Sequence, residues 1–245
     1  MSQSKVFLTA SWNHLIMANY EIGPALLRTY LPAFTELDDF NGKYYVSLVG
    51  FMFDDVKIKG ISIPFHTRFP EVNLRFYVKH TAKDGSIRRG VVFISEIVPK
   101  AAIAWVANTI YKEKYSATAM KHLVSEIQDE LLLSYSWQWK GKENLISATV
   151  DKHATIIQPG TKEDFIFEHY YGYAKVNEMI TNQYQVEHPV WQVYPVHAYT
   201  IDCHFESFYG AHFSFLDGAK PASVFVAEGS PVVIRTKNVI RMSDV

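Results

Sequence analysis

One alternating stretch of the chain, residues 69–79, limits its possible folds more than any other feature. If this stretch is a β-strand, neighbouring side chains point to opposite faces, so one face is wholly apolar and the other wholly polar. An antiparallel strand with one solvated face explains the pattern. So does a strand whose polar face lines a cavity and orients a bound polar molecule. The apolar face holds Val72, Leu74, Phe76 and Val78, and the polar face holds Glu71, Asn73, Arg75 and Tyr77.

The segments around this stretch predict further β-strands. Residues 44–53 alternate in the same way, and Asp84-Gly85 is a turn signal that joins residues 71–80 to the apolar run 90–97 as an antiparallel hairpin. We expect a short helix over 24–30, a buried apolar helix over 101–107 and a helix start at Thr161. Because no repeat or linker interrupts the chain, we predict a single, mainly β domain over residues 1–245. Further strands are expected at 131–139, 146–150, 153–157, 195–208, 222–228 and 232–239.

Composition narrows the possible partners and the cellular location. The 245 residues are 48% hydrophobic, enough for a substantial core, and a net charge of -1 makes nucleic acid an unsuitable partner. The single cysteine, Cys203, excludes an intramolecular disulfide and indicates a reducing compartment. The sequence contains neither a signal-peptide pattern nor an apolar run of about 20 residues. We therefore expect a cytoplasmic protein without a membrane partner, and homo-oligomerisation stays open.

Familiar catalytic and metal-binding motifs are absent from the sequence. It has no phosphate-binding glycine loop, no dinucleotide fingerprint, no H-E-x-x-H and no G-x-S-x-G. Asp202, His204 and Glu206, with His212 nearby, are possible metal ligands at alternate positions of an expected strand. Ligands about 7 Å apart on one strand seldom close on one ion, so a solvated strand face is the better interpretation. We expect no metal and no cofactor.

Several segments together resemble a known family. These are Leu31-Pro32, Tyr45-Val46-Ser47-Leu48-Val49, residues 71–78, residues 90–95, Tyr115 with Ala119-Met120, Glu168-His169-Tyr170 and His188-Pro189-Val190-Trp191. Their combination resembles the YqjF-like family of uncharacterised bacterial proteins, domain of unknown function 2071. That family is similar in fold to acetoacetate decarboxylase. The resemblance implies a strongly curved antiparallel β-barrel that encloses a cavity, with a few short helices beside it.

The chain departs from acetoacetate decarboxylase at the nucleophile. That enzyme forms a Schiff base through a lysine in a Gly-Phe-Pro-Lys-Lys motif, and desolvation and a neighbouring cation activate the lysine. Residues 109–115 lack this glycine, proline and lysine pair, and Tyr115 falls near the nucleophile's position. Lys112 and Lys114 flank Glu113, which would keep the pKa values of both lysines high. The sequence therefore predicts no Schiff-base chemistry.

The preferred functional hypothesis is a binding protein for a small anionic or carbonyl-containing ligand. Arg75 would hold the anionic or carbonyl group, and Asn73 and Tyr77 would form hydrogen bonds with it. Tyr45 and Trp105 would supply the apolar walls of the cavity.

Two alternatives remain open at the level of sequence. In the first, Glu71 and Arg75 only satisfy one another in a structural polar network. In the second, the cavity belongs to an enzyme of unassigned reaction, lyase-like or acid–base, in which Glu71 is the acid or base and Tyr115 or Lys114 donates a proton. We rank binding first, the network second and the enzyme third.

Overall fold

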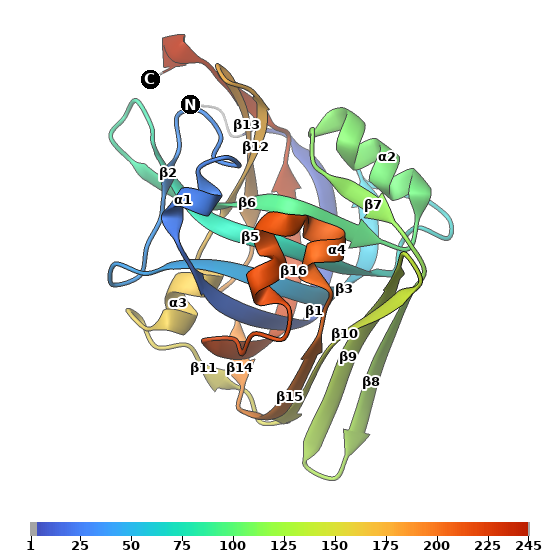
Figure 1. The fold of residues 1–245 in the computed structure, drawn as a ribbon. Coiled ribbons are helices and arrows are strands. Elements are labelled where there is room, and N and C mark those ends of the chain that lie inside the picture. The colour runs from blue at the N-terminus through green and yellow to red at the C-terminus, as the bar shows by residue number, and fades with distance from the viewer. Residues whose placement is uncertain (1–3, 245) are drawn as a thin grey trace.

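The computed structural model describes residues 4–244, and its secondary structure is mainly β (Figure 1). A 13-stranded sheet follows the order β11-β14-β16-β1-β3-β5-β6-β12-β13-β17, with β2, β4 and β7 paired beside it, and a second sheet has the order β15-β10-β9-β8. The strands are β1 Val6–Ile22, β2 Glu36–Leu37, β3 Tyr44–Ile58, β4 Ile61–Ser62, β5 Phe69–Thr81, β6 Ile87–Val98, β7 Tyr115–Ala117, β8 Met120–Ile127, β9 Glu130–Trp139, β10 Lys142–Asp151, β11 Thr155–Ile156, β12 Tyr171–Asn177, β13 Ile180–Glu187, β14 Gln192–Tyr194, β15 Val196–Asp202, β16 Ser223–Arg235 and β17 Asn238–Ile240.

The helices are short and lie beside the sheets. At the start of α3 the Thr161 side chain accepts a hydrogen bond from the Asp164 backbone N–H, as the sequence predicted. No helix within residues 4–244 is long and apolar enough to cross a membrane. The helices are α1 Pro24–Leu27, α2 Ala101–Ile110, α3 Lys162–Phe167 and α4 Phe205–Tyr209, with two 3-10 helices, η1 Ala211–Leu216 and η2 Met242–Asp244.

Strand β5 occupies a central position in the large sheet. It pairs antiparallel with β3 on one side and with β6 on the other, and the connection to β6 turns at Gly85, which has a φ of 79°. The strands predicted at 44–53 and 71–80 and the hairpin to 90–97 are confirmed. Two short pairings of β6, with β7 and with β12, are parallel, whereas the predicted barrel was antiparallel.

Both faces of β5 are buried. Its apolar side chains join a core that contains Leu133 and Trp137 of β9 and Ile146 of β10, so the four-stranded sheet covers this face. The solvated-face interpretation of the other side is wrong, because the polar side chains are also buried. Their exposed fractions are 2% for Glu71, 1% for Asn73, 9% for Arg75 and 1% for Tyr77.

The large sheet curves around the polar face of β5. Strand β13 pairs with β12 and also with β16, where Val186 lies opposite Ile234. Tyr184 of β13 and Ile234 of β16 consequently line the same interior space as Glu71. The curvature therefore converts an alternating strand pattern into an interior polar surface.

Helix α2 differs from the predicted buried helix. Of its ten residues only Ala104 is buried, and Trp105 is 69% exposed. One side of α2 faces the interior through Ile103 and Val106, while the opposite side is at the surface. The apolar run of residues 101–107 thus lies at the edge of the interior space, between this space and solvent.

The C-terminal part differs from the sequence expectation in two places. The expected strand 195–208 ends at Asp202, because Phe205 begins α4 and its backbone N–H donates to Asp217 Oδ1. The expected strands 222–228 and 232–239 are largely one strand, β16, which passes through Gly229 with a φ of 91°. A Cβ on Gly229 would lie 1.9 Å from the Trp12 carbonyl oxygen, so only glycine allows this close approach to β1.

Candidate functional site

Two contiguous chambers lie on the polar side of β5. The outer chamber has a volume of about 200 Å³ and the inner chamber about 70 Å³. The two chambers adjoin, because they share a set of lining side chains. The shared side chains are Phe53, Glu71, Glu96, Tyr115, Tyr184 and Ile234.

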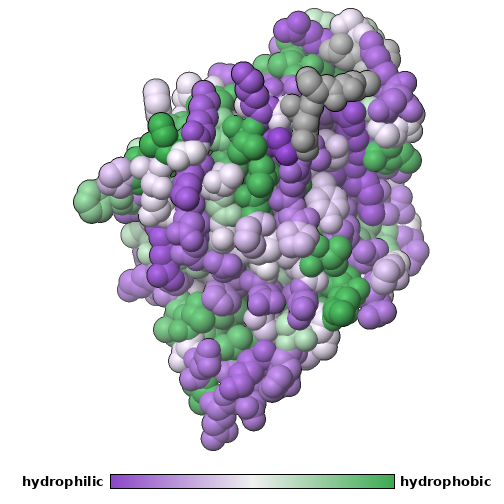
Figure 2. All heavy atoms as spheres, turned by 180° about the vertical axis from the view of Figure 1, so that it is seen from behind, coloured by the Kyte–Doolittle hydropathy of each residue, from purple (hydrophilic) through white to green (hydrophobic). Residues whose placement is uncertain are grey.

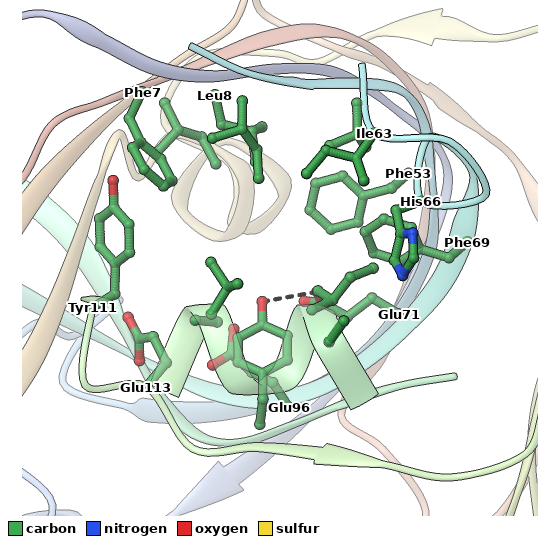
Figure 3. A pocket seen from close by; sticks show the side chains of 18 of the residues that line it. Phe7, Leu8, Phe53, Ile63, His66, Phe69, Glu71, Glu96, Tyr111 and Glu113 are labelled. Atoms are coloured by element: carbon green, nitrogen blue, oxygen red, sulfur yellow. Dashed lines mark hydrogen bonds between the residues drawn. The ribbon is translucent and has the colours of Figure 1, made fainter. Parts of the chain in front are cut away.

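The outer chamber has apolar walls and one acidic side. Figure 3 shows Glu113, Glu96 and Glu71 along one side, with Phe7 and Leu8 across from them. Helix α2 and the β3–β5 connection complete the wall through Ile103, Val106, Ile63 and Phe69. An apolar chamber with a few convergent polar groups is typical of small-molecule sites.

The outer chamber reaches the surface between α2 and the segment around β4. Ile63 and Ala102 line it and are exposed, and Phe65 and Trp105, which are 88% and 69% exposed, lie on the same two segments. On the face seen in Figure 2, apolar residues form separate patches between polar ones. The outer chamber is therefore not fully enclosed.

Glu71 is held by two neutral donors. Its Oε1 accepts from Asn73 Nδ2 at 3.1 Å, and its Oε2 accepts from the Tyr115 hydroxyl at 2.9 Å, the contact dashed in Figure 3. Asn108 of α2 fixes Tyr115, because its side chain accepts from the Tyr115 backbone N–H at 2.7 Å and donates to the Tyr115 carbonyl at 3.0 Å. Strand β5 and helix α2 thus position one acid–phenol pair from two sides.

The three glutamates hold protons near neutral pH. Burial raises the pKa of Glu71 to about 7, against the opposing hydrogen bonds from Asn73 and Tyr115. Burial likewise raises the pKa of Glu113 to about 8, although the Tyr184 hydroxyl donates to its Oε1 at 3.0 Å. The pKa of Glu96 is well above its usual range because of burial and the two neighbouring carboxylates. Such a cluster can donate protons or hydrogen bonds at pH 7.

Glu96 was missed by sequence reasoning because a β-bulge places it. Between Leu74 and Arg75 the pairing of β5 with β6 shifts by one residue, so Arg75 lies opposite Phe93 but Asn73 lies opposite Glu96. Without this shift Glu96 would point to the other face of the sheet. Glu113 was considered only as a partner for the lysines. The alternation of 112–115 was a signal that Glu113 and Tyr115 share a face.

The inner chamber is built around Arg75 and Asn73. The Arg75 guanidinium lies 5.9 Å from the centre of the Tyr77 ring, and its Nη2 is 3.7 Å from Met17 Sδ. Arg75 Nε, Asn73 Oδ1 and Glu96 Oε2 are buried and have no hydrogen-bond partner within residues 4–244. No ion pair within the same residues joins Arg75 to Glu71.

His169 adds a fourth polar group to the inner chamber, and sequence reasoning did not select it as a site residue. Its Nε2 lies 3.2 Å from Asp38 Oδ2, which also accepts from Arg89 Nε at 2.6 Å. Burial acts against ionisation of Asp38, but the hydrogen bonds from His169 and Arg89 still lower its pKa. Burial lowers the pKa of His169 to about 4, so the ring is neutral at pH 7. Nε2 therefore carries the proton and donates to Asp38, which leaves Nδ1 as an acceptor without a described partner.

Of the eight predicted site residues, the structure brings Glu71, Asn73, Arg75 and Tyr115 to the chambers. The other four line neither chamber. Tyr77 lies behind the inner chamber, with its hydroxyl 2.7 Å from Ser47 Oγ and its ring 4.8 Å from that of His169.

The structure places the remaining three predicted residues elsewhere. Tyr45 packs against Phe165, with ring centres 6.3 Å apart, and Trp105 is on the outer side of α2. Lys114 comes just before β7, and its Nζ lies 5.0 Å from the centre of the Tyr30 ring. Partial burial lowers the pKa of Lys114. No lysine among the described residues lines either chamber.

The metal candidates do not form a site. Strand β15 ends at Asp202 and Glu206 is in α4, so the alternate spacing expected for these two residues and His204 is lost. No group of three or more potential ligands with suitable geometry occurs in the described part of the chain. Cys203 is buried, and burial raises its pKa.

Solved structures with this arrangement of strands and helices define the fold class. Acetoacetate decarboxylase from Legionella pneumophila matches with a TM-score of 0.62 at 12% identity over 98% of this chain and 90% of that chain. An acetoacetate decarboxylase-like enzyme from Sphingomonas wittichii matches with a TM-score of 0.64 at 10% identity over 100% and 95%. The enduracididine biosynthesis enzyme MppR, complexed with pyruvate, matches with a TM-score of 0.64 at 12% identity over 100% and 93%. The fold is therefore acetoacetate decarboxylase-like.

The family is narrower than the fold class. Residues 9–231 match the model of DUF2071, an uncharacterized conserved protein, and the chain belongs to this family. The Bacillus subtilis (strain 168) uncharacterized protein YqjF is similar, with 34% identity over 76 residues. That match spans 31% of this chain and 31% of the length of YqjF. The predicted family resemblance is confirmed.

Proposed function

We propose that the protein binds a small organic molecule with a carboxylate or carbonyl group. That group lies at Arg75 and Asn73 in the inner chamber, and the apolar remainder extends into the outer chamber. The barrel expected from the sequence is part of this proposal, and the pairing of β13 with β16 supports it.

The observation that carries the proposal is the set of unpartnered polar atoms in the inner chamber. Buried polar groups are nearly always hydrogen-bonded, and leaving one unpaired costs about 1–3 kcal/mol. Arg75 Nε and Asn73 Oδ1 lack a described partner and line a chamber of about 70 Å³. A guest with polar atoms would satisfy both. The raised pKa values of Glu71 and Glu113 keep the adjoining acids largely uncharged near pH 6.5, so they do not repel an anion there.

A solved structure of similar fold supports a small ligand. MppR is complexed with pyruvate, which is a carboxylate and a ketone in one molecule. Because Lys112 and Lys114 line neither chamber, a guest of this kind would bind here without a Schiff base.

Isothermal titration calorimetry with pyruvate and 4-methyl-2-oxopentanoate at pH 6.5 tests the proposal. We expect saturable binding to the wild type and at least tenfold weaker binding to Arg75→Gln, which keeps a polar side chain but loses the charge. Arg68→Gln is the matched control, because Arg68 has a 67% exposed side chain and pairs with Asp54. Absence of binding by the wild type, or equal binding by Arg75→Gln, would refute the proposal.

A specific observation also supports an acid–base enzyme as a second candidate. The Glu71–Tyr115 pair combines a carboxyl group whose pKa is about 7 with a phenol at 2.9 Å, beside the same chamber. A group with a pKa near the working pH is suited to general acid–base catalysis. Exchange of the pyruvate methyl protons in D₂O, followed by nuclear magnetic resonance, measures such activity. If the protein is an acid–base enzyme, we expect the wild type to accelerate this exchange and Tyr115→Phe to lose most of the acceleration.

A further inference from the structure

The unpartnered polar atoms of the inner chamber include both hydrogen-bond donors and acceptors. Arg75 Nε and Trp12 Nε1 are donors. Asn73 Oδ1 and Glu96 Oε2 are oxygen atoms, and His169 Nδ1 is an acceptor because Nε2 donates to Asp38. All five side chains line the same chamber, and all except the half-buried Trp12 are at least nine-tenths buried. A guest that satisfies them needs two acceptors and several donors.

A primary ammonium group would supply the donors that the unpartnered acceptors require. It carries three N–H donors. Once Glu96 is ionised, the inner chamber offers three acceptors for them: Asn73 Oδ1, Glu96 Oε2 and His169 Nδ1. The acids at the junction of the chambers, Glu71 and Glu96, would compensate its charge, and the rings of Tyr115 and Tyr184 line the same junction. A metal ion is a poorer match, since the described residues contain no suitable ligand group.

A carboxylate supplies the acceptors, because its two oxygen atoms can accept from the unpartnered donors Arg75 Nε and Trp12 Nε1. The inner chamber has room for a small head group only, while the outer chamber of about 200 Å³ is walled by Phe7, Phe53 and Ile103. The complete guest would therefore have a zwitterionic head and an apolar side chain.

We infer that the cavity binds an α-amino acid with an apolar side chain. The carboxylate lies at Arg75, the ammonium group lies among Asn73 Oδ1, Glu96 Oε2 and His169 Nδ1, and the side chain occupies the outer chamber. This inference rests on the proposed function and narrows its ligand class.

Binding of an ammonium group should change the protonation of the buried carboxyl groups. Without a guest, the carboxyl cluster is partly protonated at pH 7, because burial raises the pKa values of Glu71, Glu96 and Glu113. A cation beside the cluster favours the ionised carboxylate, so a proton leaves to solvent when the amino acid binds. An oxo acid with the same skeleton brings no cation and should release none. The titratable and charged side chains that line the chambers beside this cluster are His66, Arg75, Tyr111, Tyr115, His169, Tyr171 and Tyr184. The charge of Lys114 also acts on Glu113 and lowers its pKa.

Calorimetry at pH 7 compares three probes with one carbon skeleton. L-Leucine has both charged groups, 4-methyl-2-oxopentanoate lacks the ammonium group and 3-methylbutylamine lacks the carboxylate. We expect leucine to bind at least tenfold more tightly than either. Titrations in phosphate and in Tris, buffers with very different ionisation heats, should show proton release for leucine and none for the oxo acid.

Glu96→Gln tests the ammonium position. The variant keeps the shape of the side chain but cannot ionise, so leucine affinity should fall at least tenfold and by a larger factor than the affinity for 4-methyl-2-oxopentanoate. Retained oxo-acid binding shows that the variant is folded. Glu178→Gln is the matched control, since the Glu178 side chain is 86% exposed, pairs with Lys175 and lines neither chamber.

The outcomes separate this inference from the proposed function. If the oxo acid binds as tightly as leucine or more tightly, the amino-acid inference is wrong and the proposed function stands. If leucine binds without proton release, or equally well to Glu96→Gln, the ammonium position is wrong. If neither leucine nor the oxo acid binds, both proposals fail.

Discussion

Arg75 is the residue at which the binding and network interpretations of the polar strand face diverge. A structural network requires Glu71 and Arg75 to satisfy one another. Glu71 instead accepts from Asn73 and Tyr115, and Arg75 keeps its Nε unpartnered among the described residues. Arg75 influences Glu71 only through its charge, which lowers the pKa of Glu71 less than burial raises it. The binding interpretation fits these contacts better.

Replacing Arg75 by alanine should therefore leave the fold nearly as stable as the wild type. Because the chambers reach the surface, water can fill the space left by the side chain, and no ion pair is broken. We expect the free energy of unfolding, measured by urea denaturation at pH 7, to change by less than about 1 kcal/mol. A broken buried pair would instead cost about 3 to 5 kcal/mol. A loss of that size, smaller at pH 5 where Glu71 is protonated, would make Arg75 a structural residue.

At the scale of elements, local signals predicted more than long-range ones. The alternation in residues 69–79 and the Asp84-Gly85 turn correctly predicted β5 and its hairpin with β6. The position of Glu96 depends on a one-residue bulge, and His169 lines the chamber from the connection between α3 and β12, far from β5 in the sequence. Neither effect is encoded in local periodicity. The end of β15 at Asp202 was missed because Asp217, twelve residues after Phe205, caps α4.

Two apolar side chains outside the chambers, Leu74 and Trp105, should respond differently to truncation. Leu74 of β5 is fully buried between the sheets, so Leu74→Ala should lower the free energy of unfolding by about 2–5 kcal/mol. Trp105 is 69% exposed on α2, and Trp105→Ala should change it by less than about 0.5 kcal/mol and leave pyruvate affinity unchanged. Urea denaturation and calorimetry measure both. A large effect of Trp105→Ala would show that α2 closes onto the interior more tightly than the structure shows.

At the scale of the whole molecule, the buried acids link stability to pH. The folded-state pKa values of Glu71, Glu96 and Glu113 are raised, so the folded protein binds more protons than the unfolded chain above about pH 4.5. Stability falls with rising pH in that range. The lowered pKa of His169 has the opposite effect between about pH 4 and 6.5, where the unfolded chain binds the extra proton. Above about pH 6.5, His169 therefore no longer offsets the loss of stability caused by ionisation of the three glutamates.

We expect the free energy of unfolding to decrease between pH 6.5 and 8 by on the order of 1 kcal/mol per pH unit. Glu113→Gln should reduce this slope, because glutamine cannot ionise. Urea denaturation at half-unit pH intervals measures the slope, with Glu178→Gln as the exposed control. A stability that rises across this range in the wild type would contradict the buried, protonated cluster.

We propose that the polar face of β5 binds a small organic acid inside the molecule. A crystal structure of the protein with pyruvate at saturating concentration would locate this ligand. We expect pyruvate in the inner chamber with a carboxylate oxygen about 2.7–3.2 Å from Arg75 Nε. An inner chamber that holds only water under these conditions, or pyruvate bound at another place on the molecule, would contradict it.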